Sequence, residues 1–159
     1  MAKALVAYFS ASGTTGRVAS DLASAIGADI YEIAPETPYS SADLNWNDKG
    51  SRSSLEMNDD AARPALANDV PDTSAYDVVF VGFPIWWYVE PRVVDTYLES
   101  ADLAGKTVVP FATSGGSGVG RAVSRIRSIA SGANVVEGDL LNGRPSQAKL
   151  AAWAKNVQR

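Results

Sequence analysis

Short apolar runs alternate with helical patterns along most of the chain. Five segments are predicted as strands, and the clearest are continuous apolar runs typical of strands buried on both faces of a sheet. The predicted strands are residues 4–9, 29–33, 77–82, 107–112 and 134–137. Pro110 is unusual within the fourth, because proline cannot donate to a neighbouring strand.

Apolar residues at helical spacing predict a helix after every strand but the second. Gly27 closes the first helix as a C-cap. Pro91, after Glu90, opens the second helix, and Pro145 starts the last. The inward positions are Val18, Leu22 and Ile26; Val94 and Leu98; Val119, Val123, Ile126 and Ala130; and Leu150, Trp153 or Ala154, and Val157.

Strands that alternate with helices form parallel sheets through right-handed crossovers. The chain is therefore predicted as an α/β protein with a doubly wound sheet. Its 159 residues suit a single domain covering 1–159. That length favours five parallel strands in the order 2-1-3-4-5 over the larger dinucleotide-binding form.

The connection between the second and third strands, residues 34–76, is far longer than a plain crossover needs. Its segment 40–60 is rich in Ser, Asp and Asn, with Trp46 and Leu55 as the main apolar anchors. We expect irregular structure with short helices there. Long loops in compact domains are often functional, but disorder is the alternative.

Composition narrows the chemistry, because the chain has neither cysteine nor histidine. Thiolate nucleophiles, cysteine-ligated clusters, Ser-His-Asp triads and histidine metal sites are excluded. Demanding chemistry would need a bound cofactor or carboxylates and hydroxyls. The net charge of −4 argues against nucleic acid as the main partner, since phosphate binding needs a basic face.

Nothing in the sequence predicts a membrane protein. The longest apolar stretch, residues 78–89, is too short to span a bilayer and contains Gly82 and Pro84. The first ten residues are better explained by a strand than by a signal peptide. The absence of cysteine fits a cytoplasmic location.

Ligands of open parallel sheets bind beyond the carboxyl ends of the strands, where the strand order reverses. Three loops are expected to converge there: residues 10–15, 83–89 and 113–118. The first carries four hydroxyls around a glycine just before a helix, namely Ser10, Ser12, Thr14 and Thr15 around Gly13.

Backbone N–H groups, a helix dipole and hydroxyl donors together suit a phosphate. The lysine of a Walker A loop is missing, since Arg17 follows Gly16. The loop is therefore predicted to hold a terminal phosphate rather than to transfer one. Simple capping of the helix is the alternative, but it needs only one such residue.

The second loop contains Pro84, Ile85, Trp86, Trp87 and Tyr88. Three adjacent aromatic residues cannot all point into one core, and a planar heteroaromatic ligand would suit them. One tryptophan of the pair is expected to pack inside. The third loop places small residues beside this ring site: Thr113, Ser114, Gly115, Gly116, Ser117 and Gly118. Its glycines would let backbone N–H groups approach a flat ligand.

A phosphate loop, an aromatic wall and a glycine-rich edge together describe a mononucleotide with a large planar ring, which flavin mononucleotide (FMN) fits. At this point the sequence resembles the flavodoxin family over essentially the whole chain, most of all short bacterial members with a Pro-Ile-Trp-Trp loop. The residues that carry the resemblance are 8–16, 82–87 and 110–118. It implies that the first loop binds the FMN phosphate and the other two hold the isoalloxazine ring.

The resemblance implies an electron carrier or, alternatively, an NAD(P)H-dependent FMN or quinone reductase. The partners would be a redox protein, or NAD(P)H and a quinone, for a monomer or weak homodimer. A phosphorylated-ligand module without flavin is the third hypothesis. Unlike many flavodoxins, the third loop has no aromatic residue to cover the ring, so Trp46 or Tyr39 would cover it or leave that face open.

Charged residues outside the three loops offer no convincing catalytic site, and no metal site is predicted. The Asp59-Asp60 pair is interpreted as solvated surface. Arg121, Arg125 and Arg127 follow the third loop at positions that predict an exposed helix face, with contact to a nicotinamide phosphate or an acidic partner as the alternative.

Overall fold

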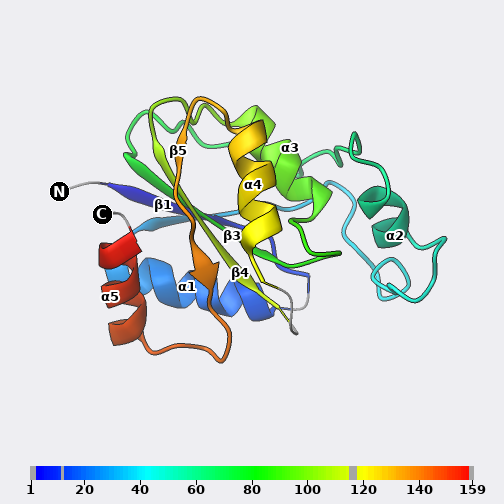
Figure 1. Ribbon diagram of the computed structural model, residues 1–159, viewed down its shortest axis with the longest axis horizontal. Helices are drawn as coiled ribbons and strands as arrows, with labels where there is room; N and C mark the ends of the chain where they lie inside the picture. The colour runs from blue at the N-terminus through cyan, green and yellow to red at the C-terminus, as the bar shows by residue number, and fades with distance from the viewer. Residues whose placement is uncertain (1–2, 12, 115–117, 158–159) are drawn as a thin grey trace.

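The strands follow one another across the sheet in the order β2-β1-β3-β4-β5, and every pairing is parallel. The computed structural model describes residues 3–11, 13–114 and 118–157. The observed order confirms the predicted doubly wound α/β architecture (Figure 1). The strands are β1 (Ala4–Tyr8), β2 (Asp29–Glu32), β3 (Val78–Pro84), β4 (Thr107–Thr113), β5 (Asn134–Val135) and β6 (Asp139–Leu140).

The predicted fifth strand, 134–137, is wrong in its extent, because two short strands share that edge of β4. The interruption lies opposite Pro110. The carbonyls of Val108 and Ala112 accept bonds from this side, so the N–H that Pro110 lacks would have pointed there. Gly138, with a φ of 67°, permits the detour, since a Cβ there would lie 1.9 Å from the Pro110 oxygen.

Helices cover both faces of the sheet (Figure 1). One face carries α1 (Thr14–Ile26) and α5 (Gln147–Val157), and the other carries α3 (Arg92–Ser100) and α4 (Gly120–Ile129). Gly27 is a left-handed C-cap, as predicted. Pro91 and Pro145 precede their helices rather than start them, because α3 begins at Arg92 with Pro91 as its N-cap and α5 begins at Gln147.

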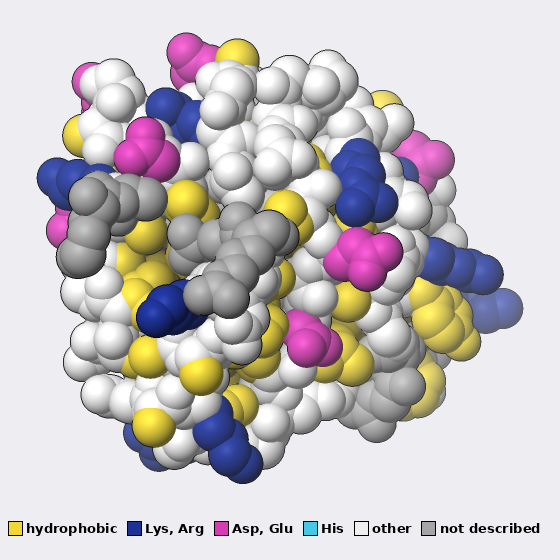
Figure 2. Space-filling view, turned by 60° about the vertical axis from the view of Figure 1, so that its left-hand side comes forward, with side chains coloured by type: hydrophobic (Ala, Val, Ile, Leu, Met, Phe, Trp, Pro, Cys, Tyr) yellow, Lys and Arg dark blue, Asp and Glu magenta, His cyan; other side chains and the backbone are white. Residues whose placement is uncertain are grey.

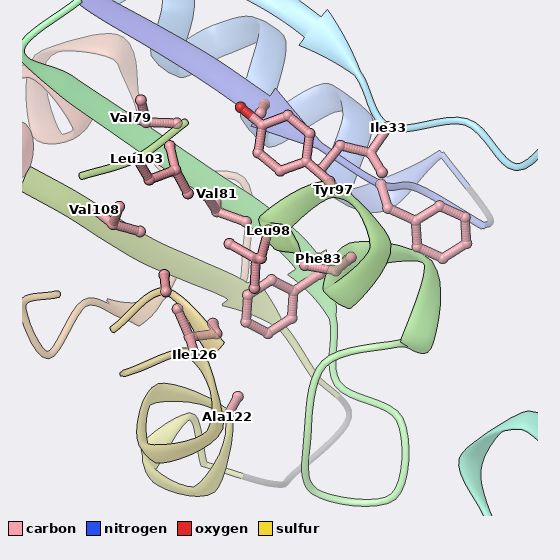
Figure 3. Close-up of a cluster of buried hydrophobic side chains, with 14 of the residues drawn as sticks. Ile33, Val79, Val81, Phe83, Tyr97, Leu98, Leu103, Val108, Ala122 and Ile126 are labelled. Carbon is pink, nitrogen blue, oxygen red and sulfur yellow. The ribbon is translucent and has the colours of Figure 1, made fainter. Parts of the chain in front are cut away.

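Alternate side chains of each strand feed two buried clusters, one on each face of the sheet. Val6, Phe80 and Phe111 face α1 and α5. The opposite cluster joins β3 to α3 and α4, and Figure 3 shows its members facing one another. Gly82 is required where it stands, since a Cβ there would lie 2.2 Å from the ring of Phe111 on the next strand.

The long connection 34–76 is largely irregular and contains one short helix, α2 (Arg52–Met57), as predicted. The predicted anchors are wrong: Trp46 is 70% exposed and Leu55 is 60% exposed. The connection is attached instead through polar contacts described below and through four residues that pack against the core: Tyr39, Leu66, Val70 and Tyr76. Figure 1 shows α2 standing apart from the sheet.

Surface charge is mixed on the face shown in Figure 2, where basic and acidic side chains are interspersed. Such a face produces no strong single-sign field to steer a charged partner. In the part of the chain that is described, no helix combines the length and the apolar character needed to cross a membrane.

Candidate functional site

The three loops predicted to form the site meet at Thr113, the last residue of β4. Pro84 pairs with Thr113 in the sheet register, and the Ile85 N–H donates to the Thr113 carbonyl at 2.9 Å. From the first loop, Thr15 Oγ1 lies 2.8 Å from Thr113 Oγ1, and both side chains are buried. The predicted convergence at the carboxyl edge of the sheet is confirmed at this residue.

The first loop turns into α1 through Gly13, which occupies the N-cap position with a φ of 92°. Glycine has no side chain to cap the helix, and the Gly13 N–H donates to Ser10 Oγ at 3.0 Å. Among the described residues, no side chain caps the helix at Gly13. The loop presents the positive end of α1, with Thr14 exposed beside it, in a form that suits an anion. Ser12 lies outside the described residues.

A hollow of about 330 Å³ adjoins this loop between α1 and the chain after β6. Two guanidinium groups, those of Arg17 and Arg144, line it together with Thr14 and Asn142. Asn142 Oδ1 also accepts a hydrogen bond from the Ser114 N–H at 2.9 Å, which ties this wall to the third loop. The sequence offered no signal for this contact, since the two residues are 28 positions apart.

The second loop folds back as a tight turn, residues 86–89, here called the aromatic hairpin. Trp86 and Val89 exchange two backbone hydrogen bonds of 2.9 and 3.0 Å. Trp87 and Tyr88 at its tip have φ values of 48° and 70°, a left-handed backbone that is unfavourable for bulky residues. This turn leaves Trp87 39% and Tyr88 58% exposed, whereas Trp86 points inward.

Trp86 is the tryptophan that packs inside. Its ring meets Phe9 edge-on at a centroid distance of 5.6 Å and Tyr39 at 5.4 Å, both at 89°. Edge-to-face contacts of this kind orient aromatic rings. Tyr39 comes from the long connection, so one of the two predicted covering residues does reach the second loop. Pro84 and Ile85, the residues before the hairpin, are half-buried.

The third loop is described only at its two ends. Thr113 is buried and Ser114 is half-buried, whereas Gly115 and Gly116 lie outside the described residues. A Cβ at Gly118 would meet nothing within 4 Å. Packing against the described part of the protein therefore does not require glycine at that position.

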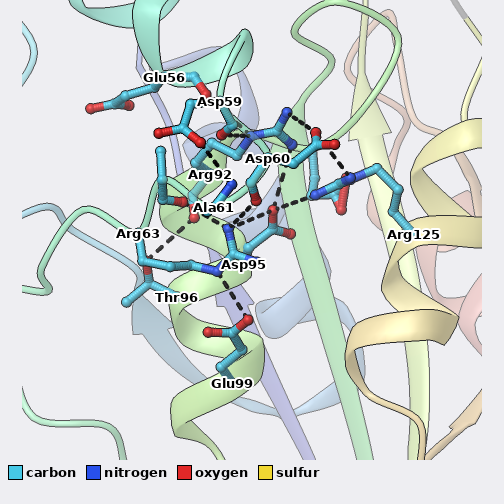
Figure 4. Close-up of polar contacts among 12 residues, drawn as sticks. Glu56, Asp59, Asp60, Ala61, Arg63, Arg92, Asp95, Thr96, Glu99 and Arg125 are labelled. Carbon is cyan, nitrogen blue, oxygen red and sulfur yellow. Dashed lines mark hydrogen bonds and ion pairs between the residues drawn. The ribbon is translucent and has the colours of Figure 1, made fainter.

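An ion cluster lies directly behind the aromatic hairpin, and it was missed in the sequence (Figure 4). Glu90 and Asp95 are fully buried. Arg125 from α4 binds both, with Nε 3.1 Å from Glu90 Oε1 and Nη2 3.0 Å from Asp95 Oδ2. Because Arg125 is only 27% exposed, its predicted place on an open helix face is wrong. Asp60 is solvated as expected, but it also binds Arg92 at 3.0 Å.

Burial raises the pKa of Glu90 to about 8, and the charge of Asp95 adds to this rise. The cluster balances these acids with Arg92 and Arg125. No group of three or more carboxylates is placed to hold a metal ion within the described ranges. The only hint in the sequence was a carboxylate directly after an apolar run, which by itself does not predict burial.

Comparison with known proteins identifies the class. The family model Flavodoxin matches residues 3–157. The chain therefore belongs to the flavodoxin family, as its loops predicted. No curated protein matches it significantly.

Solved structures extend this result. A candidate flavoprotein from Bacteroides eggerthii is 50% identical, with a TM-score of 0.94 over 100% of this chain and 99% of that chain. One from Bacteroides uniformis is 48% identical, with a TM-score of 0.92 over 97% and 98%. A flavoprotein from Lactobacillus acidophilus in complex with FMN is 24% identical, with a TM-score of 0.68 over 97% and 99%. At that identity its likeness concerns the fold.

Proposed function

We propose that this chain binds FMN and carries electrons through the non-covalently bound flavin. The observation that carries the proposal is the meeting of the three loops at Thr113 in a chain of the flavodoxin family. The FMN complex of the structural neighbour from Lactobacillus acidophilus supports the choice of flavin.

Phosphate and ring are assigned to opposite ends of this site. The N–H groups at the start of α1, with Ser10 and Thr14 beside them, suit the phosphate. Pro84, Ile85 and the aromatic hairpin offer the ring an apolar wall, whereas the backbone donors expected from the third loop lie outside the described residues. The flavin supplies the redox chemistry when bound, so the protein needs no histidine, cysteine or metal of its own.

Electrostatics predict the direction of the redox potential. An apolar aromatic wall and a net charge of −4 disfavour a negatively charged reduced flavin. We expect the bound flavin to have a lower potential than free FMN. A potential equal to or above that of free FMN, measured by equilibration with reference dyes, would count against this assignment.

One set of titrations tests the proposal directly. The purified protein is expected to be yellow, or to take up FMN when it is isolated without ligand. FMN should bind more tightly than riboflavin, because only FMN carries the phosphate. A colourless protein that takes up neither compound would overturn the redox assignment and favour a module for another phosphorylated ligand.

The alternative is an NAD(P)H-dependent FMN or quinone reductase. Its support is the exposed tip of the aromatic hairpin, where the guanidinium of Arg121 lies 5.3 Å from the Tyr88 ring centroid. A cation beside exposed aromatic residues would suit a nicotinamide nucleotide. A carrier should oxidise NADPH negligibly without a partner reductase, whereas the enzyme should turn over with a quinone.

We also propose that the chain works in the cytoplasm. Disulfides rarely persist there, and a protein without cysteine does not depend on them.

A further inference from the structure

The aromatic hairpin is held from behind by buried polar contacts. Glu90 follows Val89, which forms the backbone pair with Trp86. Its carboxylate binds Arg125, which also binds Asp95. Because a buried polar group is costly unless it is hydrogen-bonded, this contact fixes where the hairpin leaves the site and α3 begins.

Arg92 extends the ion cluster to the long connection (Figure 4). Its Nε donates to the carbonyls of Glu56 at 3.2 Å and Asp59 at 3.1 Å. Its Nη2 donates to the Met57 carbonyl at 2.9 Å and to Asp60 Oδ1 at 3.0 Å. The guanidinium therefore binds the carbonyl end of α2, where a helix lacks internal partners.

This attachment matters because α2 has only six residues and cannot be stable alone. Glu56 of α2 accepts a hydrogen bond from the Tyr39 hydroxyl and one from Arg52 Nε. The Arg52 guanidinium also lies 4.0 Å from the Tyr39 ring centroid. Tyr39 in turn packs edge-on against Trp86 and Phe9. A continuous set of contacts thus runs from Arg92 through α2 and Tyr39 to Trp86.

We propose that Arg92 is a positioning residue for the ring end of the site, acting through α2 and Tyr39 on Trp86. Its side chain is 3% exposed and its guanidinium contacts the end of α2 and Asp95 rather than the three loops, so it acts on the site through other residues. This inference rests on the proposed function for its ligand, but the contacts themselves do not depend on a flavin. It gives the long connection a role: to orient the aromatic hairpin from outside the site.

The first test replaces the guanidinium by a side chain of similar length, Arg92→Met. Riboflavin and FMN should both bind roughly tenfold more weakly, a size usual for residues coupled to a site from a distance. The bound flavin should also change its potential and the shape of its absorption bands. Arg127→Met is the matched control, because Arg127 also donates to a carbonyl, that of Val135, away from the hairpin. It should leave both affinities unchanged.

A second variant covers the case in which Arg92→Met does not fold. Glu56→Gln removes the negative charge that pairs with Arg52 and accepts from the Tyr39 hydroxyl, and it should weaken riboflavin and FMN about threefold. In a double-mutant cycle, Glu56→Gln and Arg92→Met should be non-additive on riboflavin affinity. Additive effects, or unchanged affinities in folded variants, would overturn the proposal.

Amide hydrogen exchange separates this proposal from the proposed function. The N–H groups of Trp86 and Val89 bond across the hairpin to each other's carbonyls, and Arg92→Met or Glu56→Gln should speed their exchange without any ligand. Faster exchange in a protein that binds no flavin would support the positioning role and overturn the flavin assignment. Unchanged exchange would overturn the positioning role, whatever the protein binds.

Discussion

The phosphate end and the ring end of the site share one edge of the sheet, but they are built from contacts of very different range. At the phosphate end, Ser10 and Gly13 are three positions apart and Gly13 starts α1 directly. At the ring end, Trp86 depends on Tyr39 and Phe9, and the hairpin is held by Glu90 and its partner 35 positions away. Local sequence therefore builds the proposed phosphate end, whereas tertiary packing builds the aromatic wall.

The largest expected effect is a pH dependence of the free energy of unfolding, caused by Glu90 at the ring end. Between its ordinary pKa of 4.5 and about 8, Glu90 is protonated in the folded protein and ionised in the unfolded chain. The folded state then binds more protons than the unfolded chain does. The contribution of Glu90 to stability is therefore complete below pH 4.5 and is lost as the pH rises through about 8. The slope is at most about 1.4 kcal/mol per pH unit.

Glu90→Gln should remove this slope and should be more stable than the wild type above pH 8, as measured by urea unfolding from pH 6 to 9. The charged groups that face Glu90 are Asp95 and Arg125. Arg144→Gln, which breaks an exposed ion pair with Asp21, serves as the control and should keep the slope. An unchanged slope in Glu90→Gln would show that the carboxyl is ionised in the fold.

Trp86→Ala tests the ring end next. It removes an aromatic wall whose stacking on a base-like ring is worth about 2 kcal/mol, or about thirtyfold in affinity. FMN and riboflavin should lose this factor equally, as measured by fluorescence titration. Trp87→Ala is the comparison, because Trp87 lies outside the core contacts. A larger loss from Trp87→Ala would reassign the stacking residue to the tip of the hairpin.

Thr15→Val tests the phosphate end. Loss of a hydrogen bond at a charged ligand should weaken FMN about tenfold and leave riboflavin nearly unchanged. Thr15 also bonds Thr113, so Thr15→Ser is needed as a control that keeps the hydroxyl. Equal loss of both ligands would mean that Thr15 acts only by joining the first and third loops.

Trp46→Ala should have the smallest effect. Since Trp46 is 70% exposed, its removal should change the free energy of unfolding by less than about 0.5 kcal/mol. Flavin affinity should also stay the same. A clear loss of affinity for both FMN and riboflavin would instead mean that Trp46 moves over the ring on binding.

Prediction from the sequence succeeded where structure depends on neighbouring residues. Apolar runs indicated the strands, and helical spacing indicated the helices, with Gly27 at the end of the first. Prediction failed where a residue's environment comes from distant segments. Arg125 and Glu90 show ordinary surface patterns in sequence, yet they pair inside the protein. Trp46 and Leu55 show the reverse, being apolar but exposed, because an irregular connection has no periodicity that predicts its inner side.

Sequence alone was enough to predict the strand order, the family and the place of the three loops, because parallel strands bring their loops to one edge of the sheet. Tertiary structure was needed to show which tryptophan turns inward, that Tyr39 packs edge-on against it, and that Arg92 contacts the long connection behind it. The physical reason is range: periodicity and capping act within a few residues. Buried charge pairs and edge-to-face aromatic contacts exist only once distant segments are brought together.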